Sequence, residues 1–174
     1  VSQTMMVAQR LYESGLITYM RTDSVNLSSL CIGAAKEEII KLYGEEYSSP
    51  RNFHTHSKGA QEAHEAIRPT YMANTSIEGT AQERRLYDLI WKRTAASQMA
   101  EAQIEKTTVN IASSNFDERF IANGEVVKFD GFIKVYREST DEDAEQQDEF
   151  AHNLPPIKEG DVLTRREISS TERY

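Results

Sequence analysis

Tyr19 precedes Arg21 by two residues in the segment Thr18-Tyr19-Met20-Arg21-Thr22-Asp23. In an extended chain, residues two apart lie on the same face, so the phenol and the guanidinium can act together. A phenol with its ordinary pKa of about 10 is a poor nucleophile unless positive charge stabilises the phenolate. A guanidinium provides that charge and can hold a phosphate through two nitrogens, and the Asp23 carboxylate could orient it. Spacing alone favours a plainer interpretation, an edge strand with a half-buried tyrosine and a surface Arg–Asp pair, because short motifs are common by chance.

A second cluster lies in residues 63–70, where His64 precedes Arg68 by four residues. On a helical turn this spacing places both cations on one face and turns Glu65 away from them. A histidine and an arginine on one face can cradle a phosphate. The alternative is a helix end whose cations face solvent, and spacing alone favours that alternative.

Two further groups resemble metal sites. His54 and His56, taken with His64, could form a zinc site or the paired histidines of a metal-dependent nickase that acts with a tyrosine. Zinc sites need three or four well-placed ligands, and the threonine between the first two histidines replaces the apolar residue of such a nickase. Residues 141–145 match the pattern D-x-D-x-E, but they belong to a run of six acids over residues 141–149 without a basic residue. That run indicates a solvated, mobile loop, so we predict no metal site in this chain.

Length and composition exclude several classes of protein. The chain has 174 residues, 39% of them hydrophobic and 28% charged, which excludes collagen-like and fully disordered chains. Its size suits one medium domain or two small ones. Cys31 is the only cysteine, so neither an intrachain disulfide nor a cysteine-based zinc site can form. The sequence has no run of about 20 apolar residues, the length that a membrane span needs.

Charge is distributed unevenly along the chain, whose net charge is −8. Residues 1–104 carry 11 basic and 12 acidic side chains, whereas residues 105–174 carry 9 and 16. The acidic excess therefore lies almost entirely in the second part. A local site for nucleic acid is permitted in the first part, although charge alone does not predict it.

The hydrophobic pattern predicts an α+β chain that changes character near residue 105. Helical spacing and capping residues predict helices over residues 2–14, 28–43 and about 80–102, and a short helix near 61–67 ended by Pro69. Alternation then predicts strands over residues 107–111, 120–122, 125–129, 132–136 and 162–168, with a hairpin turn at Asn123-Gly124. We expect a helical domain over 1–104 and part of a β-rich domain over 105–174.

The predicted β part is small for an independent domain. Four or five short strands leave open edges that other strands or loops must cover. The chain also begins without a methionine and ends on the charged stretch 171–174. We therefore expect the chain to be a piece of a larger protein.

Two long motifs resemble bacterial DNA topoisomerases of type IA, the topoisomerase I family. They are Gly15-Leu16-Ile17-Thr18-Tyr19-Met20-Arg21-Thr22-Asp23-Ser24 and Ala63-His64-Glu65-Ala66-Ile67-Arg68-Pro69-Thr70. Residues 5–12 also resemble the helix that leads to the nucleophile of that family. Two such motifs, in the right order and at about the right separation, are far more specific than either spacing alone.

The resemblance assigns a role to each candidate residue. It implies that Tyr19 attacks a phosphodiester of single-stranded DNA, forming a 5′-phosphotyrosyl link and freeing a 3′-hydroxyl. Arg21 corresponds to the arginine on the scissile phosphate, and His64 and Arg68 correspond to residues beside the bound strand. Asp23 has a supporting role. Such a covalent ester stores the energy of the broken bond, so religation needs no ATP.

The resemblance also implies partners that this chain lacks. Mg²⁺ is expected in the full-length enzyme, bound by an acidic domain that nothing here matches, and no cofactor is expected in this fragment. Expected partners are single-stranded or negatively supercoiled DNA and the remaining domains of the same enzyme, and no membrane is expected as a partner. The full-length enzyme is expected in the cytoplasm, associated with the nucleoid. The fragment is expected to be inactive alone, with residues 105–174 in the arch that opens the gate. The alternative function is a non-catalytic module for single-stranded DNA, in which Tyr19 stacks on a base.

Overall fold

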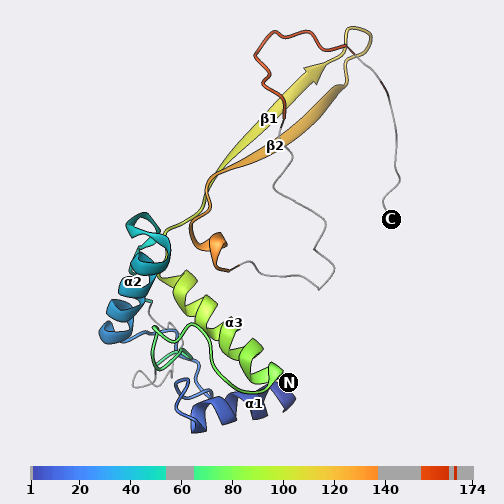
Figure 1. Cartoon of the computed structure of the whole chain (residues 1–174). Helices are drawn as coiled ribbons and strands as arrows, with labels where there is room; N and C mark the ends of the chain where they lie inside the picture. The colour runs from blue at the N-terminus through green and yellow to red at the C-terminus, as the bar shows by residue number, and fades with distance from the viewer. Residues whose placement is uncertain (1, 54–64, 137–153, 165–166, 168–174) are drawn as a thin grey trace. The chain divides into compact units, whose positions relative to one another are not determined.

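The computed structural model describes residues 2–53, 65–136, 154–164 and 167. The chain divides into two compact units, the first made of residues 1–103 and 128–146 and the second of residues 104–127 and 147–174. The first unit contains the helices, and the second contains most of a two-stranded antiparallel sheet (Figure 1). The α+β fold class is thereby confirmed. Within the described ranges, residues 128–136 belong to the helical unit, whereas the sequence pattern assigned everything after residue 104 to the β part.

Local capping signals determine where the helices of the first unit begin. The unit contains α1 (Ser2–Glu13), α2 (Ser29–Tyr43), α3 (Ala81–Ser97) and the short 3₁₀ helices η1 (Glu45–Tyr47) and η2 (Gly131–Lys134). The Ser28 hydroxyl accepts a hydrogen bond from the Cys31 N–H at the start of α2. At the start of α3, Thr80 and Glu83 form the predicted capping box, which satisfies two backbone N–H groups that the helix cannot pair.

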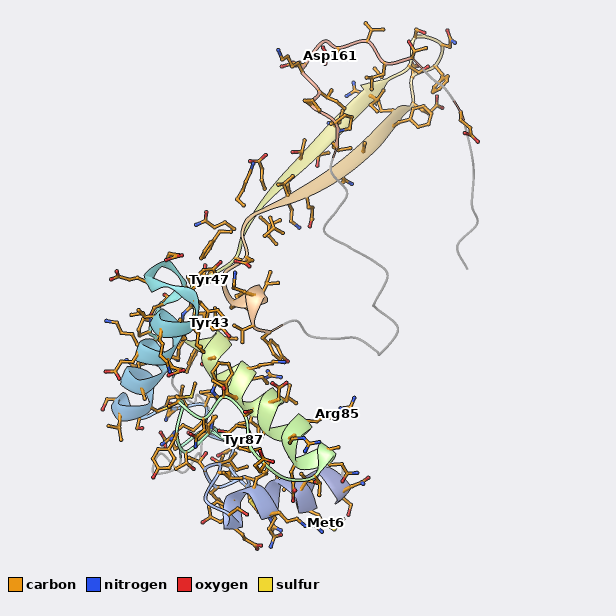
Figure 2. All side chains as sticks on the ribbon, viewed as in Figure 1. Met6, Tyr43, Tyr47, Arg85, Tyr87 and Asp161 are labelled. Atoms are coloured by element: carbon orange, nitrogen blue, oxygen red, sulfur yellow. The ribbon has the colours of Figure 1, made fainter. Side chains whose placement is uncertain are left out.

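The core of the first unit joins α1 and α3 to the segments between the helices. Its buried members are Val7, Ala8, Leu11, Ile17, Met20, Ala35, Met72, Tyr87, Trp91 and Ala95. Tyr87 projects from α3 (Figure 2) and is 1% exposed. Its hydroxyl donates a hydrogen bond to the Asn74 carbonyl at 2.7 Å. The indole N–H of Trp91 donates to the Met72 carbonyl at 2.9 Å. Both aromatic side chains therefore bury their rings and still satisfy their polar atoms.

Long-range backbone pairing ends α3 earlier than the sequence predicts. The helix was expected to reach about residue 102 but ends at Ser97. The next residues pair with the segment after η1 instead, since Gln98 accepts the Ser49 N–H at 2.9 Å and Ala100 donates to the Tyr47 carbonyl at 2.8 Å. These hydrogen bonds replace the ones that a longer helix would have made.

The strand predicted over residues 132–136 was wrong. Residues 131–134 form η2, and the backbone at Gly131 has a φ of 50°. The Phe132 N–H donates to the Ala100 carbonyl at 2.9 Å, so the chain turns back on the end of α3 at this point. A positive φ followed by a tight turn is incompatible with an extended strand.

The sheet of the second unit consists of β1 (Gln103–Ala112) and β2 (Arg119–Phe129). The hairpin turn predicted at Asn123-Gly124 was wrong, because both residues lie inside β2 and the chain turns at residues 113–118. The Asn123 side-chain oxygen instead accepts a hydrogen bond from the Thr108 hydroxyl at 3.0 Å, across the two strands. Residues 162–164 of the last predicted strand are irregular, and the acidic run 141–149 lies outside the described residues.

No helix in the described part of the chain is long and apolar enough to cross a membrane.

Gly131 is expected to tolerate alanine much less than Gly15 does. A Cβ at Gly131 would lie 2.5 Å from the Ala100 carbonyl oxygen, whereas a Cβ at Gly15 (φ +70°) would meet nothing within 4 Å. Both alanine variants carry the strain of a left-handed backbone, about 1–2 kcal/mol, and Gly131→Ala adds a steric clash of about 1–3 kcal/mol. Urea unfolding followed by the fluorescence of Trp91 measures both changes. Equal losses would mean that the backbone near residue 100 moves aside without cost.

Candidate active site

The end of α1 delivers the segment that carries Tyr19. The N–H of Gly15 donates to the Tyr12 carbonyl at 2.8 Å, and the N–H of Leu16 donates to the Leu11 carbonyl at 2.9 Å. With a φ of 70° at Gly15, these bonds form a Schellman motif, which ends the helix and redirects the chain. The sequence Glu13-Ser14-Gly15 thus determines where the segment of Tyr19 begins.

Buried neighbours hold Tyr19 at the surface. Ile17 and Met20 are 2% and 8% exposed in the core, whereas Tyr19 is 43% exposed. Arg21 is exposed as well, so Tyr19 and Arg21 flank the buried Met20. The backbone bends at residues 18, 20 and 21, so this part of the segment is not a regular strand. The ring of Tyr12, on α1, contacts the Tyr19 ring edge to face, with 5.3 Å between ring centroids. Tyr19 is therefore partly exposed, and its ring contacts Tyr12 while its neighbours Ile17 and Met20 are buried.

Residues 66–70 lie beside this segment although they are about 50 positions away in the sequence. The Thr18 N–H donates to the Arg68 carbonyl, and the Thr70 N–H donates to the Leu16 carbonyl, both at 2.9 Å. Ile17 and Pro69 form an antiparallel bridge between these two bonds. The two motifs that are separate in the sequence are therefore adjacent in the structure.

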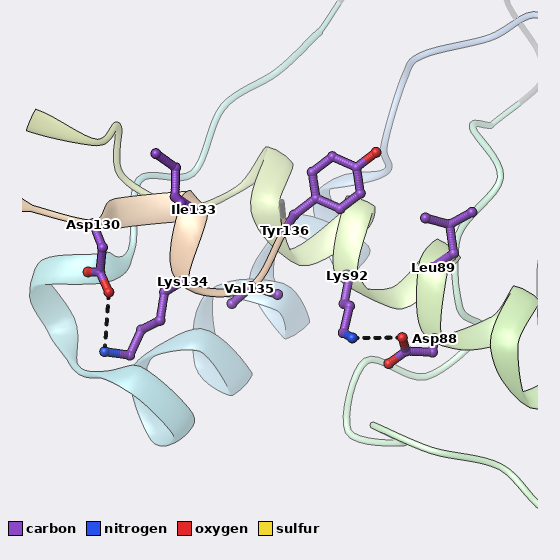
Figure 3. A pocket seen from close by; sticks show the side chains of 8 residues that line it. All are labelled: Asp88, Leu89, Lys92, Asp130, Ile133, Lys134, Val135 and Tyr136. Atoms are coloured by element: carbon purple, nitrogen blue, oxygen red, sulfur yellow. Dashed lines mark ion pairs between the residues drawn. The ribbon is translucent and has the colours of Figure 1, made fainter. Parts of the chain in front are cut away.

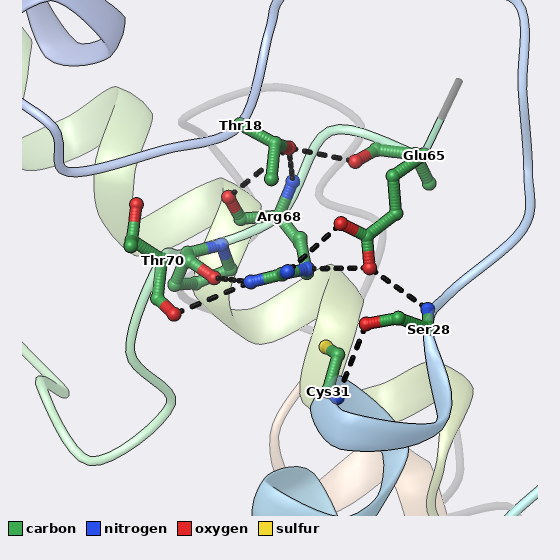
Figure 4. A network of polar contacts seen from close by, with 8 residues as sticks. Thr18, Ser28, Cys31, Glu65, Arg68 and Thr70 are labelled. Carbon is green, nitrogen blue, oxygen red and sulfur yellow. Dashed lines mark hydrogen bonds and ion pairs between the residues drawn. The ribbon is translucent and has the colours of Figure 1, made fainter. Parts of the chain in front are cut away.

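Glu65 and Arg68 form an ion pair at the centre of a polar network (Figure 4). The Nε and Nη2 of Arg68 donate to the two carboxylate oxygens of Glu65 at 2.9 and 2.8 Å. Glu65 also accepts the Ser28 N–H at 2.8 Å, at the N-cap of α2. The prediction that Glu65 points away from Arg68 was wrong, because the two side chains meet directly at 2.8 Å. Residues 65–68 are not helical, and a spacing of three residues would permit the pair on a helix as well.

The predicted site residues separate into those at the surface and those in the network. Tyr19, Arg21 and Asp23 are exposed on one segment, and no ion pair joins Arg21 to Asp23 within the described ranges. Arg68 lies beside that segment, with a side chain that is 13% exposed. His64 lies outside the described residues, as do His54 and His56. The roles of all these residues in binding DNA stay predictions.

Sequence reasoning missed two residues of the network, Thr18 and Ser28. The Thr18 hydroxyl donates to the Ala66 carbonyl at 2.7 Å and accepts the Arg68 N–H at 2.9 Å. Ser28 contributes through its backbone N–H, which no side-chain pattern reveals. The only available signal was the spacing of Glu65 and Arg68, three residues apart, which permits an ion pair.

A groove between α3 and η2 lies apart from these residues (Figure 3). Its lining includes two lysines and two aspartates, paired as Lys92–Asp88 at 2.7 Å and Lys134–Asp130 at 3.6 Å. The charges of these pairs cancel, so the groove offers no surplus positive charge for a phosphate. Neither Tyr19 nor Arg68 lines it.

The described residues offer no site for the magnesium that the resemblance implies. No group of three histidine, cysteine or acidic side chains in the described ranges is arranged to hold a metal ion. The Glu65 carboxylate, the acidic group nearest to the Tyr19 segment in the polar network, is occupied by Arg68 and Ser28. The magnesium expected in the full-length enzyme stays a prediction.

The Glu65–Arg68 pair is expected to make the stability of the helical unit depend on pH. Burial alone would raise the pKa of the Glu65 carboxyl, but hydrogen bonds from Arg68 and Ser28 outweigh it and hold the pKa below 4.5. A lowered pKa stabilises the folded chain above the unfolded pKa, and this contribution is lost as the pH falls through the folded pKa.

The comparison is between the wild type and Glu65→Gln, by urea unfolding at a series of pH values. Above about pH 5.5, the wild type is expected to be more stable by about 1 kcal/mol, and the difference is expected to shrink below about pH 4.5. A difference that stays constant down to about pH 3 would contradict the lowered pKa.

Comparisons with known proteins agree with the two motifs. A family model described as DNA topoisomerase matches residues 1–174. DNA topoisomerase 1 of Streptomyces coelicolor is 45% identical over 95% of this chain, and that of Synechococcus elongatus is 46% identical over 97%. The chain covers 18% and 19% of the lengths of these two relatives.

A solved structure supports the same assignment. Full-length topoisomerase I from Thermotoga maritima superposes with a TM-score of 0.66 and 36% sequence identity, over 79% of this chain and 24% of that one. Since the family model spans the whole chain, the resemblance seen in the two motifs is confirmed. The chain belongs to the bacterial DNA topoisomerase I family, of type IA, and corresponds to a segment of such an enzyme.

Proposed function

We propose that this segment supplies the nucleophile of an ATP-independent enzyme that relaxes negatively supercoiled DNA by passing strands through a transient single-strand break. The observation that supports it is the exposed Tyr19 phenol on a segment whose neighbours Ile17 and Met20 are buried. A nucleophile must be accessible to DNA and yet held in position, and this segment provides both.

The reaction exchanges one phosphodiester for another. The Tyr19 oxygen bonds to the phosphorus and gives up its proton, the bond from phosphorus to the 3′ oxygen breaks, and that oxygen gains a proton. The 3′-hydroxyl later attacks the phosphotyrosyl ester and restores the strand, so no nucleotide is consumed. Arg21, which is exposed beside Tyr19, would stabilise the charge that develops on the phosphate.

Other parts of the full-length enzyme complete this proposal. They would bind Mg²⁺, and the substrate would be single-stranded or negatively supercoiled DNA. The enzyme would act in the cytoplasm, near the nucleoid. His64 would lie near the bound strand, and Asp23 would have a supporting role. The chain spans about a fifth of the Streptomyces coelicolor relative, so we expect no relaxation by this fragment alone.

Mapping the covalent adduct tests the proposal. The full-length enzyme is incubated with a single-stranded suicide oligonucleotide, and the trapped complex is digested with trypsin and sequenced by mass spectrometry. Cleavage after Arg10 and Arg21 yields a peptide that contains both Tyr12 and Tyr19, and fragmentation distinguishes them. The phosphate is expected on Tyr19. An adduct on another residue, or none at all, would contradict the proposal and favour a module that only stacks Tyr19 on a base.

Arg21→Lys is expected to slow DNA cleavage by the full-length enzyme about tenfold or more, while the affinity for DNA changes little. Lysine keeps the charge but lacks the planar pair of nitrogens that can meet two phosphate oxygens in the transition state. Single-turnover adduct formation and fluorescence anisotropy measure the two quantities. Arg10→Lys, at an exposed arginine on α1, is the control. If cleavage and affinity fall by the same factor, Arg21 is only a binding residue.

A further inference from the structure

The Arg68 guanidinium is engaged within the protein. It makes four hydrogen bonds, two to the Glu65 carboxylate and two from Nη1 to the carbonyls of Pro69 and Thr70, at 2.8 and 3.2 Å. The Arg68 side chain is 13% exposed and that of Glu65 is 26% exposed. Glu65 neutralises the charge of Arg68, so a phosphate would have to displace a bidentate partner to bind there.

This ion pair is linked to the nucleophile segment through Thr18. The Thr18 hydroxyl accepts a hydrogen bond from the backbone N–H of Arg68 at 2.9 Å and donates one to the carbonyl of Ala66 at 2.7 Å (Figure 4). The Thr18 N–H bonds to the Arg68 carbonyl at 2.9 Å. Thr18 directly precedes Tyr19, so these three bonds determine where the backbone of Tyr19 begins.

The pair also links the start of α2 to the same place. One Glu65 oxygen accepts the Ser28 N–H at 2.8 Å, and the Ala66 N–H donates to the Asn26 carbonyl at 2.8 Å. Three segments, the one before Tyr19, the one after it and the one around Arg68, therefore meet at residues 65–68: Thr18 bonds to the backbone of Ala66 and Arg68, and Ser28 bonds to the Glu65 carboxylate. Such a partly buried pair adds little net stability but specifies one arrangement of the segments around it.

We propose that the Glu65–Arg68 pair, acting through Thr18, positions Tyr19 for attack and makes no contact with DNA itself. Arg68 is thus a positioning residue, in place of the position beside the bound DNA strand that the resemblance implied. The inference rests on Tyr19 being the nucleophile. The binding of DNA and the attack on it are then separable, because the pair affects only the geometry of the attack.

Three variants of the full-length enzyme test this, with wild type alongside: Arg68→Gln, Thr18→Val and Thr18→Ser. Thr18→Val keeps the shape of the side chain but removes the hydroxyl, and Thr18→Ser keeps the hydroxyl. For each, we measure the single-turnover rate of adduct formation on a single-stranded oligonucleotide. We also measure the affinity for that oligonucleotide over a series of salt concentrations.

Arg68→Gln and Thr18→Val are expected to slow adduct formation about tenfold or more, while Thr18→Ser stays close to the wild-type rate. Affinity and its salt dependence are expected to match those of wild type. The control Arg10→Gln removes one exposed positive charge outside the network and is expected to leave the rate unchanged. If Arg68→Gln does not fold, the Thr18 variants still decide the question.

Two results would overturn the inference. A salt slope of affinity that falls by about 0.7 in Arg68→Gln would show a direct phosphate contact. A wild-type rate of adduct formation in Thr18→Val would show that the network does not position Tyr19. Failure of the proposed function is distinguishable from either, because wild type itself would then form no adduct on Tyr19.

Discussion

Tyr19→Phe is expected to abolish the covalent complex between DNA and the full-length enzyme, with a loss of relaxation of at least about 10⁴-fold. The change removes one oxygen atom and keeps the ring. Tyr19 is 43% exposed, so loss of its hydroxyl should not disturb the core. Because the ring is kept, the affinity for DNA should stay near that of wild type. Suicide-substrate trapping, plasmid relaxation and anisotropy measure the three quantities.

Tyr12→Phe is the matched control for this experiment. Tyr12 contacts Tyr19 edge to face and is 42% exposed, so it offers a second phenol of similar accessibility. The control should keep both the adduct and the relaxation activity, because phenylalanine preserves the ring contact. An adduct that persists in Tyr19→Phe and disappears in Tyr12→Phe would identify Tyr12 as the nucleophile instead.

Trp91→Ala is expected to lower the free energy of unfolding of the helical unit by about 3–5 kcal/mol. The side chain is 4% exposed in the core, and its indole N–H satisfies the Met72 carbonyl at 2.9 Å. Alanine leaves a cavity and an unpaired carbonyl in the same place. Since domains are stable by about 5–15 kcal/mol, this is a large fraction of the total. Urea unfolding followed by circular dichroism measures the change without needing tryptophan.

Leu89→Ala on the same helix is the control for Trp91→Ala. Leu89 is 45% exposed, and its truncation should cost less than about 1 kcal/mol. Similar losses from both variants would mean that α3 does not bury Trp91 in solution. A normal stability of Trp91→Ala would also contradict the core described above.

Hydrogen bonds between residues close in the sequence made the helix starts predictable. Ser28 caps α2 through a residue three positions away, and Thr80 and Glu83 cap α3 over the same distance. Gly15 ends α1 with bonds that span three and five residues. Because each of these contacts joins residues no more than five apart, the sequence determines it without reference to the rest of the fold.

Pairing between distant segments decided the elements that the sequence mispredicted. Asn123-Gly124 is a strong hairpin signal, but a two-residue turn there would interrupt a strand that runs unbroken over residues 119–129 beside β1. Residues 113–118 contain turn-forming residues as well and close the longer hairpin. Likewise, backbone bonds from Ser49 and to Tyr47 end α3 at Ser97, where helical spacing alone would continue it.

The candidate site shows the same division. The motif around Tyr19 and Arg21 could be identified from the sequence, because residue type and spacing within one segment indicate the chemistry. The ion pair of Arg68 with Glu65 was mispredicted although their spacing of three residues permits it. The contact with Thr18 could not be predicted, because Thr18 is 50 residues from Arg68. The sequence alone therefore determined which residues could react. Only the tertiary structure decided which residues hold them, because those hydrogen bonds form after segments distant in the chain have packed together.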